Sequence, residues 1–290
     1  MRKYFKSRIG VFIVLALVVA AAVAVFTGCE TILPNASSLP PDSVRVHFLD
    51  VGQADCEFIE LPNEQTMLID AGDNGTENDV IGYISALGYD AIDYVVATHP
   101  HADHIGGMAE VLDRFEIGKI YMPRKSHTSK TFEDMLTVIQ NKNISLNAAE
   151  TGVSILSDGD LNISILSPSD VSGSDLNNVS AVVKLDYGEA SFLFMGDAEA
   201  EIESGLLSQD IDSDILKVGH HGSKTSSSDA FIAAVSPIHA VISCGADNEY
   251  GHPSKKTLET LDKYGVTVHR TDLDGTIVVT GNKSGDYTID

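Results

Sequence analysis

Apolar and polar residues follow one another after position 43 in a pattern that predicts short strands and amphipathic helices. The first block begins with β-prone segments separated by Gly or Pro-Asn breaks, and it passes into helices that alternate with buried strands. Its predicted elements are strands at 44–51, 55–61 and 66–70, a helix at 78–88, a strand at 93–99, a helix at 106–116, a strand at 119–123 and a helix at 130–142.

A second strand-rich block begins at residue 144 and passes into a second alternation of helices and strands. Because both blocks share this order, they predict two sheets packed face to face with helices outside. The predicted fold class is α/β, as a four-layer αββα sandwich in one domain over 44–290. The predicted elements of the second block are strands at 144–150, 153–159, 161–168, 180–188 and 190–197, a helix near 199–208, a strand at 214–219, a helix at 228–235, a strand at 239–245, a helix at 254–265 and a strand at 266–271.

The N-terminal segment, residues 1–29, has the layout of an export signal. A basic stretch precedes 18 uninterrupted apolar residues at 9–26, and Cys29 follows. The layout resembles a bacterial lipoprotein signal, which implies acylation of Cys29. An uncleaved membrane anchor is the alternative, since 18 residues are also enough for a short membrane-spanning helix. Either interpretation predicts a domain at the outer face of the cytoplasmic membrane, joined by a Pro/Ser-rich linker at 30–43.

The charge of the chain narrows the partners that we expect. The sequence has 42 acidic and 19 basic residues, a net charge of −23, and loss of residues 1–28 would make it −27 because four basic and no acidic residues lie there. Such a charge repels phosphate backbones unless basic patches or metal ions intervene, which argues against a tight nucleic-acid binder. Cys56 and Cys244 stand in apolar surroundings that favour buried free thiols over a disulfide. Any metal site is therefore expected to use histidine and carboxylate ligands.

The segment HPHADH, at 99–104, places three histidines and an aspartate where a predicted buried strand ends. Sites in layered α/β folds lie at such strand ends. His99 and His101 lie on one side of an extended segment, so both imidazoles can face one ion, whereas Asp103 and His104 follow the turn and face another point. Histidine and carboxylate ligands suit Zn²⁺, Mn²⁺ or Fe. A solvated polar loop is the alternative, and it would not need this placement.

At these residues the chain resembles the metallo-β-lactamase fold superfamily, whose hallmark is His-x-His-x-Asp-His after a strand; the resemblance covers roughly 44–280. LIDAG matches an early motif in which Asp70 supports the site, and FLFMGDAE ends a strand at Asp197, which matches a carboxylate that bridges two metals. A helix N-cap is the alternative for Asp197. The resemblance implies two divalent ions, Zn or Mn, held by His99, His101, Asp103, His104, Asp197 and His221.

The same resemblance implies hydrolysis by a metal-activated water. Asp103 would orient this nucleophile, and Asp70 would support the site. His220 and His221 follow a later strand; His221 is favoured as a metal ligand and His220 as the residue that faces the substrate. We therefore predict Asp103, Asp70 and His220 as the catalytic residues.

Four further polar residues are predicted to contact substrate. No histidine occurs at 128–219, where β-lactamases carry a third ligand to the first metal, so Asn178, a substrate oxygen or a water is expected there and antibiotic hydrolysis is not. Ser223 and Lys224 could hold a phosphate oxygen, with an ordinary surface pair as the alternative. His252 could reach the cleft, with a turn histidine as the alternative.

HFLDVGQAD, NNVSAVVKL and LKVGHHGSKTS resemble the competence-protein branch, in which a similar domain accompanies a DNA-uptake channel; the usual GQGDS reads GQADC here. We therefore expect a free-standing, surface-tethered phosphodiesterase or nuclease-like enzyme, with extracellular DNA as one substrate. The acidic surface favours an alternative, hydrolysis of another ester such as a phosphorylcholine ester or a lactone. A non-catalytic lipid-tethered binding protein is the third interpretation. The sequence carries no indication of oligomeric state.

Overall fold

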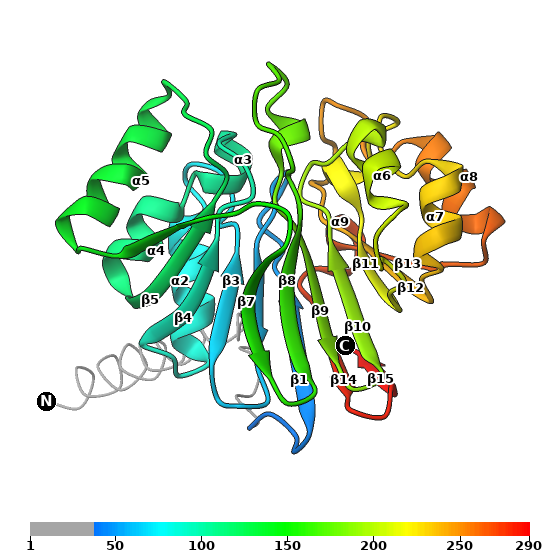
Figure 1. Cartoon of the computed structure of the whole chain (residues 1–290), viewed down its shortest axis with the longest axis horizontal. Coiled ribbons are helices and arrows are strands. Elements are labelled where there is room, and N and C mark those ends of the chain that lie inside the picture. Colours follow the sequence, from blue (N-terminus) through cyan, green and yellow to red (C-terminus); the bar gives the residue numbers. More distant parts are fainter. Residues whose placement is uncertain (1–37) are drawn as a thin grey trace, which may run out of the picture. The chain divides into compact units, whose positions relative to one another are not determined.

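The computed structural model describes residues 38–290, which form two sheets with helices on their outer faces (Figure 1). The predicted signal at 1–29, with Cys29, and most of the predicted linker lie outside the described residues. Within 38–290, no helix has both the length and the apolar character needed to cross a membrane.

The first sheet is eight-stranded and has the order β15-β14-β1-β2-β3-β4-β5-β6. Helices α2, α4 and α5 cover its outer face. These elements span β1 Ser43–Phe48, β2 Glu57–Glu60, β3 Thr66–Ile69, α2 Glu77–Ala86, β4 Ala91–Val96, α4 Met108–Arg114, β5 Glu116–Met122, α5 Lys130–Asn141, β6 Ser145–Ala148, β14 Ile277–Asn282 and β15 Tyr287–Ile289.

The second sheet is seven-stranded and has the order β13-β12-β11-β10-β9-β8-β7. Helices α6, α7 and α8 cover its outer face. These elements span β7 Val153–Asp158, β8 Leu161–Ser167, β9 Val182–Tyr187, β10 Ala190–Phe194, α6 Ala200–Leu206, β11 Ile215–Lys217, α7 Asp229–Val235, β12 His239–Ile242, α8 Lys255–Lys263 and β13 Thr267–Arg270. The short helices are α3 Ala102–Ile105, η1 Asn177–Val179, η2 Gly219–Gly222 and α9 Thr271–Asp274.

Alternation of side chains along the strands produces three apolar layers between these four structural layers. On β3, Met67 and Ile69 face the other sheet and Leu68 faces the helices. On β10, Phe194 faces the first sheet, where its ring lies 6.1 Å from that of Phe48 on β1, while other residues of β10 face α6 and α7. The period of two residues in a strand thus buries both faces of each sheet. The predicted αββα sandwich is confirmed.

Two parts of the predicted strand assignment need correction. The segment at 144–150 was expected to open the second block, but β6 pairs in parallel with β5 in the first sheet. A strand that follows a helical crossover packs beside the strand before that helix, and α5 is such a crossover. The hairpin of β14 and β15 was not predicted, and it returns to the first sheet, where β14 pairs antiparallel with β1.

The parallel strands of both sheets determine where polar loops gather. β3 to β6 run parallel in the first sheet, and β10 to β13 run parallel in the second. Loops that leave the carboxyl ends of parallel strands lie at one edge of a sheet. The loops after β3, β4, β10 and β11 carry the residues expected to form the site.

Replacement of Phe48 by Ala tests the packing between the sheets. Phe48 is fully buried against Phe194, so we expect Phe48→Ala to lower the free energy of unfolding by about 3–5 kcal/mol. Leu273→Ala is the control, because that side chain is 69% exposed and its loss should change stability by less than about 0.5 kcal/mol. Chemical denaturation measures both, and equal effects would contradict the layer arrangement.

Candidate metal centre

The HPHADH segment is held against the loop that follows β3. β4 ends at Val96, and α3 begins two residues after Pro100. The backbone NH of Ala71 donates to the carbonyl of His104 at 2.8 Å. A Cβ on Gly106 would lie 2.1 Å from the backbone nitrogen of Asn74, so only glycine allows this approach. The contiguous motif is thereby folded into a compact turn whose side chains converge.

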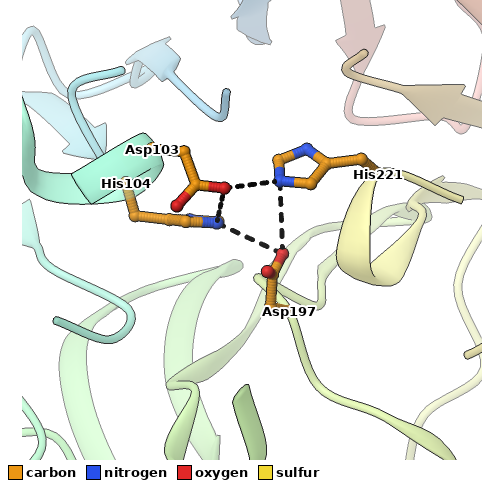
Figure 2. Close-up of side chains that lie close together, drawn as sticks. All are labelled: Asp103, His104, Asp197 and His221. Carbon is orange, nitrogen blue, oxygen red and sulfur yellow. Dashed lines mark hydrogen bonds and ion pairs between the residues drawn. The ribbon is translucent and has the colours of Figure 1, made fainter. Parts of the chain in front are cut away.

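The convergent side chains form three groups with metal-ligand spacing, of which Asp55, Asp70 and His104 are one and the other two share Asp197. His99, His101 and Asp197 offer ligand atoms within 4.8 Å of one another. Asp103, His104, Asp197 and His221 do the same (Figure 2). The two groups that share Asp197 contain the six residues that the resemblance implied as ligands, and the structure brings all of them together.

Asp197 belongs to two of these groups, and its two oxygens face different histidines. Oδ1 lies 3.2 Å from Nε2 of His104 and 3.7 Å from Nε2 of His221, whereas Oδ2 lies 3.8 Å from Nε2 of His99. This geometry suits a carboxylate between two ions. The N-cap alternative for Asp197 is wrong, because the N-cap of α6 is Glu199.

Hydrogen bonds at Nδ1 turn the imidazoles so that Nε2 faces Asp197. His104 Nδ1 lies 2.6 Å from Asp70 Oδ2, and Asp70 also accepts from the backbone NH and the hydroxyl of Thr98. His221 Nδ1 lies 3.0 Å from the carbonyl oxygen of Ser243 and 3.2 Å from Asp55 Oδ1. Such contacts set the tautomer and direction of a metal-binding histidine. Asp70 thus has the supporting position expected from the sequence.

The donor set fits a bound cation. His104 Nε2 and Asp197 Oδ1 are fully buried, and among the described residues neither makes a hydrogen bond. Burial lowers the pKa of His221, but Asp197 and Asp55 outweigh it and raise this pKa to about 10. The carboxylates of Asp197 and Asp55 therefore favour a positive charge beside His221. A divalent ion held by neutral histidines would supply that charge.

A cavity of about 310 Å³ opens onto the two groups that share Asp197. His252 lies in this cavity, where its ring is 5.5 Å from that of His220 and 5.7 Å from that of the exposed Tyr250. Burial and the nearby His220 and His221 lower the pKa of His252 to about 4, so it is neutral near pH 7. The lining residues are Gln53, His101, Ala102, Asp103, Asn177, Asp197, His220, His221, Tyr250 and His252.

Three residues predicted to contact substrate lie elsewhere. Asn178 lines a separate cavity of about 600 Å³, and it is Asn177 that lines the cavity at the metal centre. Ser223 is buried, and its hydroxyl lies 2.9 Å from that of Thr225. Lys224 is exposed, and in 38–290 its ammonium group has no hydrogen-bond or ion-pair partner. The one-residue shift at Asn178 follows from the tight turn of η1, which points successive side chains in different directions.

A buried ion pair behind His221 was not predicted from the sequence. Lys217 Nζ lies 2.7 Å from Asp55 Oδ2, and both side chains are about 1% exposed. The backbone NH of Asp55 also donates to the carbonyl of Asp103 at 3.1 Å. A lysine inside the apolar run of β11 was the signal that could have indicated it, because charged side chains are seldom buried without a partner.

An αββα sandwich with histidines and aspartates gathered at the carboxyl ends of its parallel strands is the arrangement of a class of metal-dependent enzymes. Residues 49–246 match the family model described as the metallo-beta-lactamase superfamily. The chain therefore belongs to the metallo-β-lactamase superfamily, as its motifs indicated.

Relatives include ComE operon protein 3 of Bacillus subtilis, 31% identical over 254 residues that cover 80% of this chain and 32% of the relative. Competence protein ComA of Neisseria gonorrhoeae is 28% identical over 260 residues, which are 88% of this chain and 35% of the relative. The resemblance to competence proteins is confirmed, and the chain spans about a third of the length of these relatives.

The fold also resembles CmlA of Streptomyces venezuelae, a diiron β-hydroxylase, with a TM-score of 0.55 and 18% identity over 84% of this chain and 54% of CmlA. Since that enzyme is a hydroxylase, the shared fold does not by itself define the reaction.

Replacement of Lys217 by Met tests the buried ion pair. It leaves the Asp55 carboxylate buried without its cation, so we expect the free energy of unfolding to fall by about 3–5 kcal/mol. Adding Asp55→Asn should restore most of the loss, because the buried carboxylate that lost its lysine partner is then also removed. Lys184→Met is the control, since Lys184 is buried but one of its partners, Asp210, is 86% exposed and can be solvated. A double variant no more stable than Lys217→Met alone would contradict this account.

Proposed function

We propose that the protein is a metal-dependent hydrolase with two divalent ions, Zn or Mn, that acts on phosphodiester bonds at the outer face of the cytoplasmic membrane. The observation that carries the proposal is Asp197, which belongs to two groups of ligand atoms, has oxygens that face different histidines, and lines one cavity with members of both groups. When bound, such a pair of ions supplies an activated water at neutral pH and polarises an oxygen of the substrate.

The chain's own residues would hold and orient the reactants. Asp103 is a carboxylate that lines the cavity and is partly exposed, so it is placed to accept a proton from a water bound there. Asn177 and His252 line the same cavity and offer hydrogen-bonding groups to the substrate.

Two features support a phosphodiester as the substrate. The relatives carry the names of competence proteins, which connects this domain with DNA. Lys224 follows the His220–His221 pair, and Lys256 lies in the first turn of α8; both side chains are exposed. The two are neighbours, because Lys256 Nζ lies 3.2 Å from the carbonyl oxygen of Lys224. They form a local basic patch on an acidic chain, and such a patch attracts phosphate. A lipid or an uncleaved anchor at the predicted signal would hold the domain at the outer face of the membrane. Extracellular DNA would be the phosphodiester polymer at that location.

One observation favours a second candidate, hydrolysis of a phosphorylcholine ester or another ester that is not a polyanion. The cavity of about 600 Å³ on the other side of η1 is lined by Asp170, Asp175 and Glu201. Carboxylates there would repel a second phosphate and attract a cationic group. A panel of single- and double-stranded DNA, bis(p-nitrophenyl) phosphate, p-nitrophenyl phosphorylcholine and a lactone, each with Zn²⁺ or Mn²⁺, distinguishes the candidates. A protein that binds neither ion would instead be a non-catalytic tethered binding protein.

Loss of the shared carboxylate should abolish activity together with metal binding. We expect Asp197→Ala to lose at least one of two ions per chain and to reduce turnover by more than about 100-fold, the loss that removal of a metal ligand should exceed. Asp103→Asn should reduce turnover equally while the thermal unfolding midpoint stays near that of the wild type, because Asp103 lies at the rim. Elemental analysis and kinetics measure these effects. His127→Ala is the control, since its imidazole contacts Ser129 and lies outside both ligand groups.

Asp70 gives a graded test of the same centre. It acts through His104 and Thr98, so Asp70→Asn should weaken metal affinity or turnover by about 10- to 100-fold without abolishing either. Titration with Zn²⁺ against a competing chelator measures the affinity. An Asp70→Asn protein with the affinity and rate of the wild type would show that this contact has only a structural role.

A further inference from the structure

One of the two groups of ligand atoms that share Asp197 is smaller than the other. Asp103, His104, Asp197 and His221 make four ligands, whereas His99, His101 and Asp197 make three. No histidine occurs at 128–219 to complete the smaller group. Structural and catalytic zinc sites both use a fourth position, filled by protein, water or substrate. The surroundings of Asp197 indicate which group fills it here.

His220 presents a nitrogen to the same oxygen of Asp197 that His99 faces. His220 Nε2 lies 3.8 Å from Asp197 Oδ2, the distance also found from His99 Nε2 to that oxygen. Two ligands about 2.1 Å from one ion and separated by the tetrahedral angle lie roughly 3.4 Å apart. His220 therefore lies beside Asp197 Oδ2, the oxygen that His99 also faces, but it is not among the residues whose ligand atoms all lie within 4.8 Å of one another.

A carboxylate fixes the direction of the His220 ring. His220 Nδ1 lies 3.1 Å from Glu199 Oε1, and the same oxygen accepts a hydrogen bond from the Thr225 hydroxyl at 2.9 Å. The arrangement repeats that of Asp70 with His104, where a carboxylate at Nδ1 leaves Nε2 facing Asp197. Glu199 is thus in the position of a residue that orients a metal-binding imidazole.

The backbone is strained to bring the ring there. His220 and His221 have φ values of +52° and +51°, so two successive side chains occupy the left-handed region. Residues in this conformation are strained and persist where the surrounding structure holds them. The NH of His220 donates to the carbonyl of Gly196 at 3.0 Å, which fastens this turn to the residue before Asp197. The turn places both rings around the carboxylate of Asp197. A solvent-exposed His220 without a role at this carboxylate would not require such a strained turn.

We infer that His220 is the fourth ligand of the metal ion bound by His99, His101 and Asp197, and that Glu199 is its positioning residue. This inference rests on the proposed metal centre and replaces the sequence-based assignment of His220 to substrate contact. With His220 as a ligand, this ion needs no Asn178, substrate oxygen or water in place of the histidine that β-lactamases carry. His252 keeps the role at the cavity wall, where its ring lies 5.5 Å from that of His220.

The test is zinc binding by the full-length protein and two variants. His220→Asn is the main variant, because Asn tolerates the left-handed backbone and its shorter side chain withdraws from Asp197. We expect it to retain one tightly bound Zn²⁺ and to bind the other at least about 100-fold more weakly, as measured by elemental analysis and chelator competition. Glu199→Gln should weaken the same ion by about 10- to 100-fold. Replacement of zinc by Co²⁺ gives a second readout, because loss of one nitrogen ligand changes the visible spectrum of one ion only.

His252→Ala is the matched control, a histidine of the same cavity that should leave both zinc affinities unchanged. If His220→Asn binds two Zn²⁺ with wild-type affinity and only turnover falls, His220 contacts substrate and the inference is wrong. If His220→Asn does not fold, Glu199→Gln decides, and unchanged zinc affinity in that variant overturns the inference. A wild-type protein that binds no zinc would overturn the proposed function as well, which separates the two failures.

Discussion

A buried carboxylate at the meeting point of two sheets is the constraint on which the site depends. Asp197 is 2% exposed, and histidine nitrogens from two segments of the chain, 99–104 and 220–221, surround it. Removal of a carboxylate from water costs several kcal/mol unless a cation compensates it. The nearby histidines compensate it only if they are protonated, and neutral histidines do so only through a bound ion. The strand positions, the loop conformations and the buried hydrogen bonds together bring the groups that compensate the charge of Asp197 close to it.

Two sheets are needed to satisfy it. The loop after β4 brings His99 to His104 from the first sheet, and the loops after β10 and β11 bring Asp197 and the His220–His221 pair from the second. Apolar packing of residues such as Phe48 and Phe194 holds the sheets together, so the distance between ligands depends on the hydrophobic layer below them. A change in that layer therefore reaches the site through the spacing of strand ends.

Local features of the sequence predicted more than long-range contacts did. HPHADH is contiguous, and Asp197 and His221 end apolar strands, so their chemistry could be predicted from short segments. The Asp55–Lys217 pair joins residues 162 positions apart, and no local pattern encodes that contact. The sheet that receives β6 or β14 depends in the same way on crossovers and pairing, because β-prone composition specifies a strand and not its neighbours. At Asn177 the local pattern identified the loop, and the turn of η1 decided which side chain enters the cavity.

The distribution of charge connects the site with the whole chain. A net charge of −23 raises the concentration of divalent cations near the surface and lowers that of polyanions. The first effect favours loading of a centre built from carboxylates, and the second opposes approach of DNA at low ionic strength. Screening over a Debye length of about 8–10 Å at physiological salt confines this repulsion to short range. If the substrate is a phosphodiester, as proposed, its recognition would have to come from groups close to the centre, such as the metal ions that we propose there. An ester that carries a cationic group would meet no such barrier, so the dependence of turnover on salt should differ in sign between the two classes of substrate.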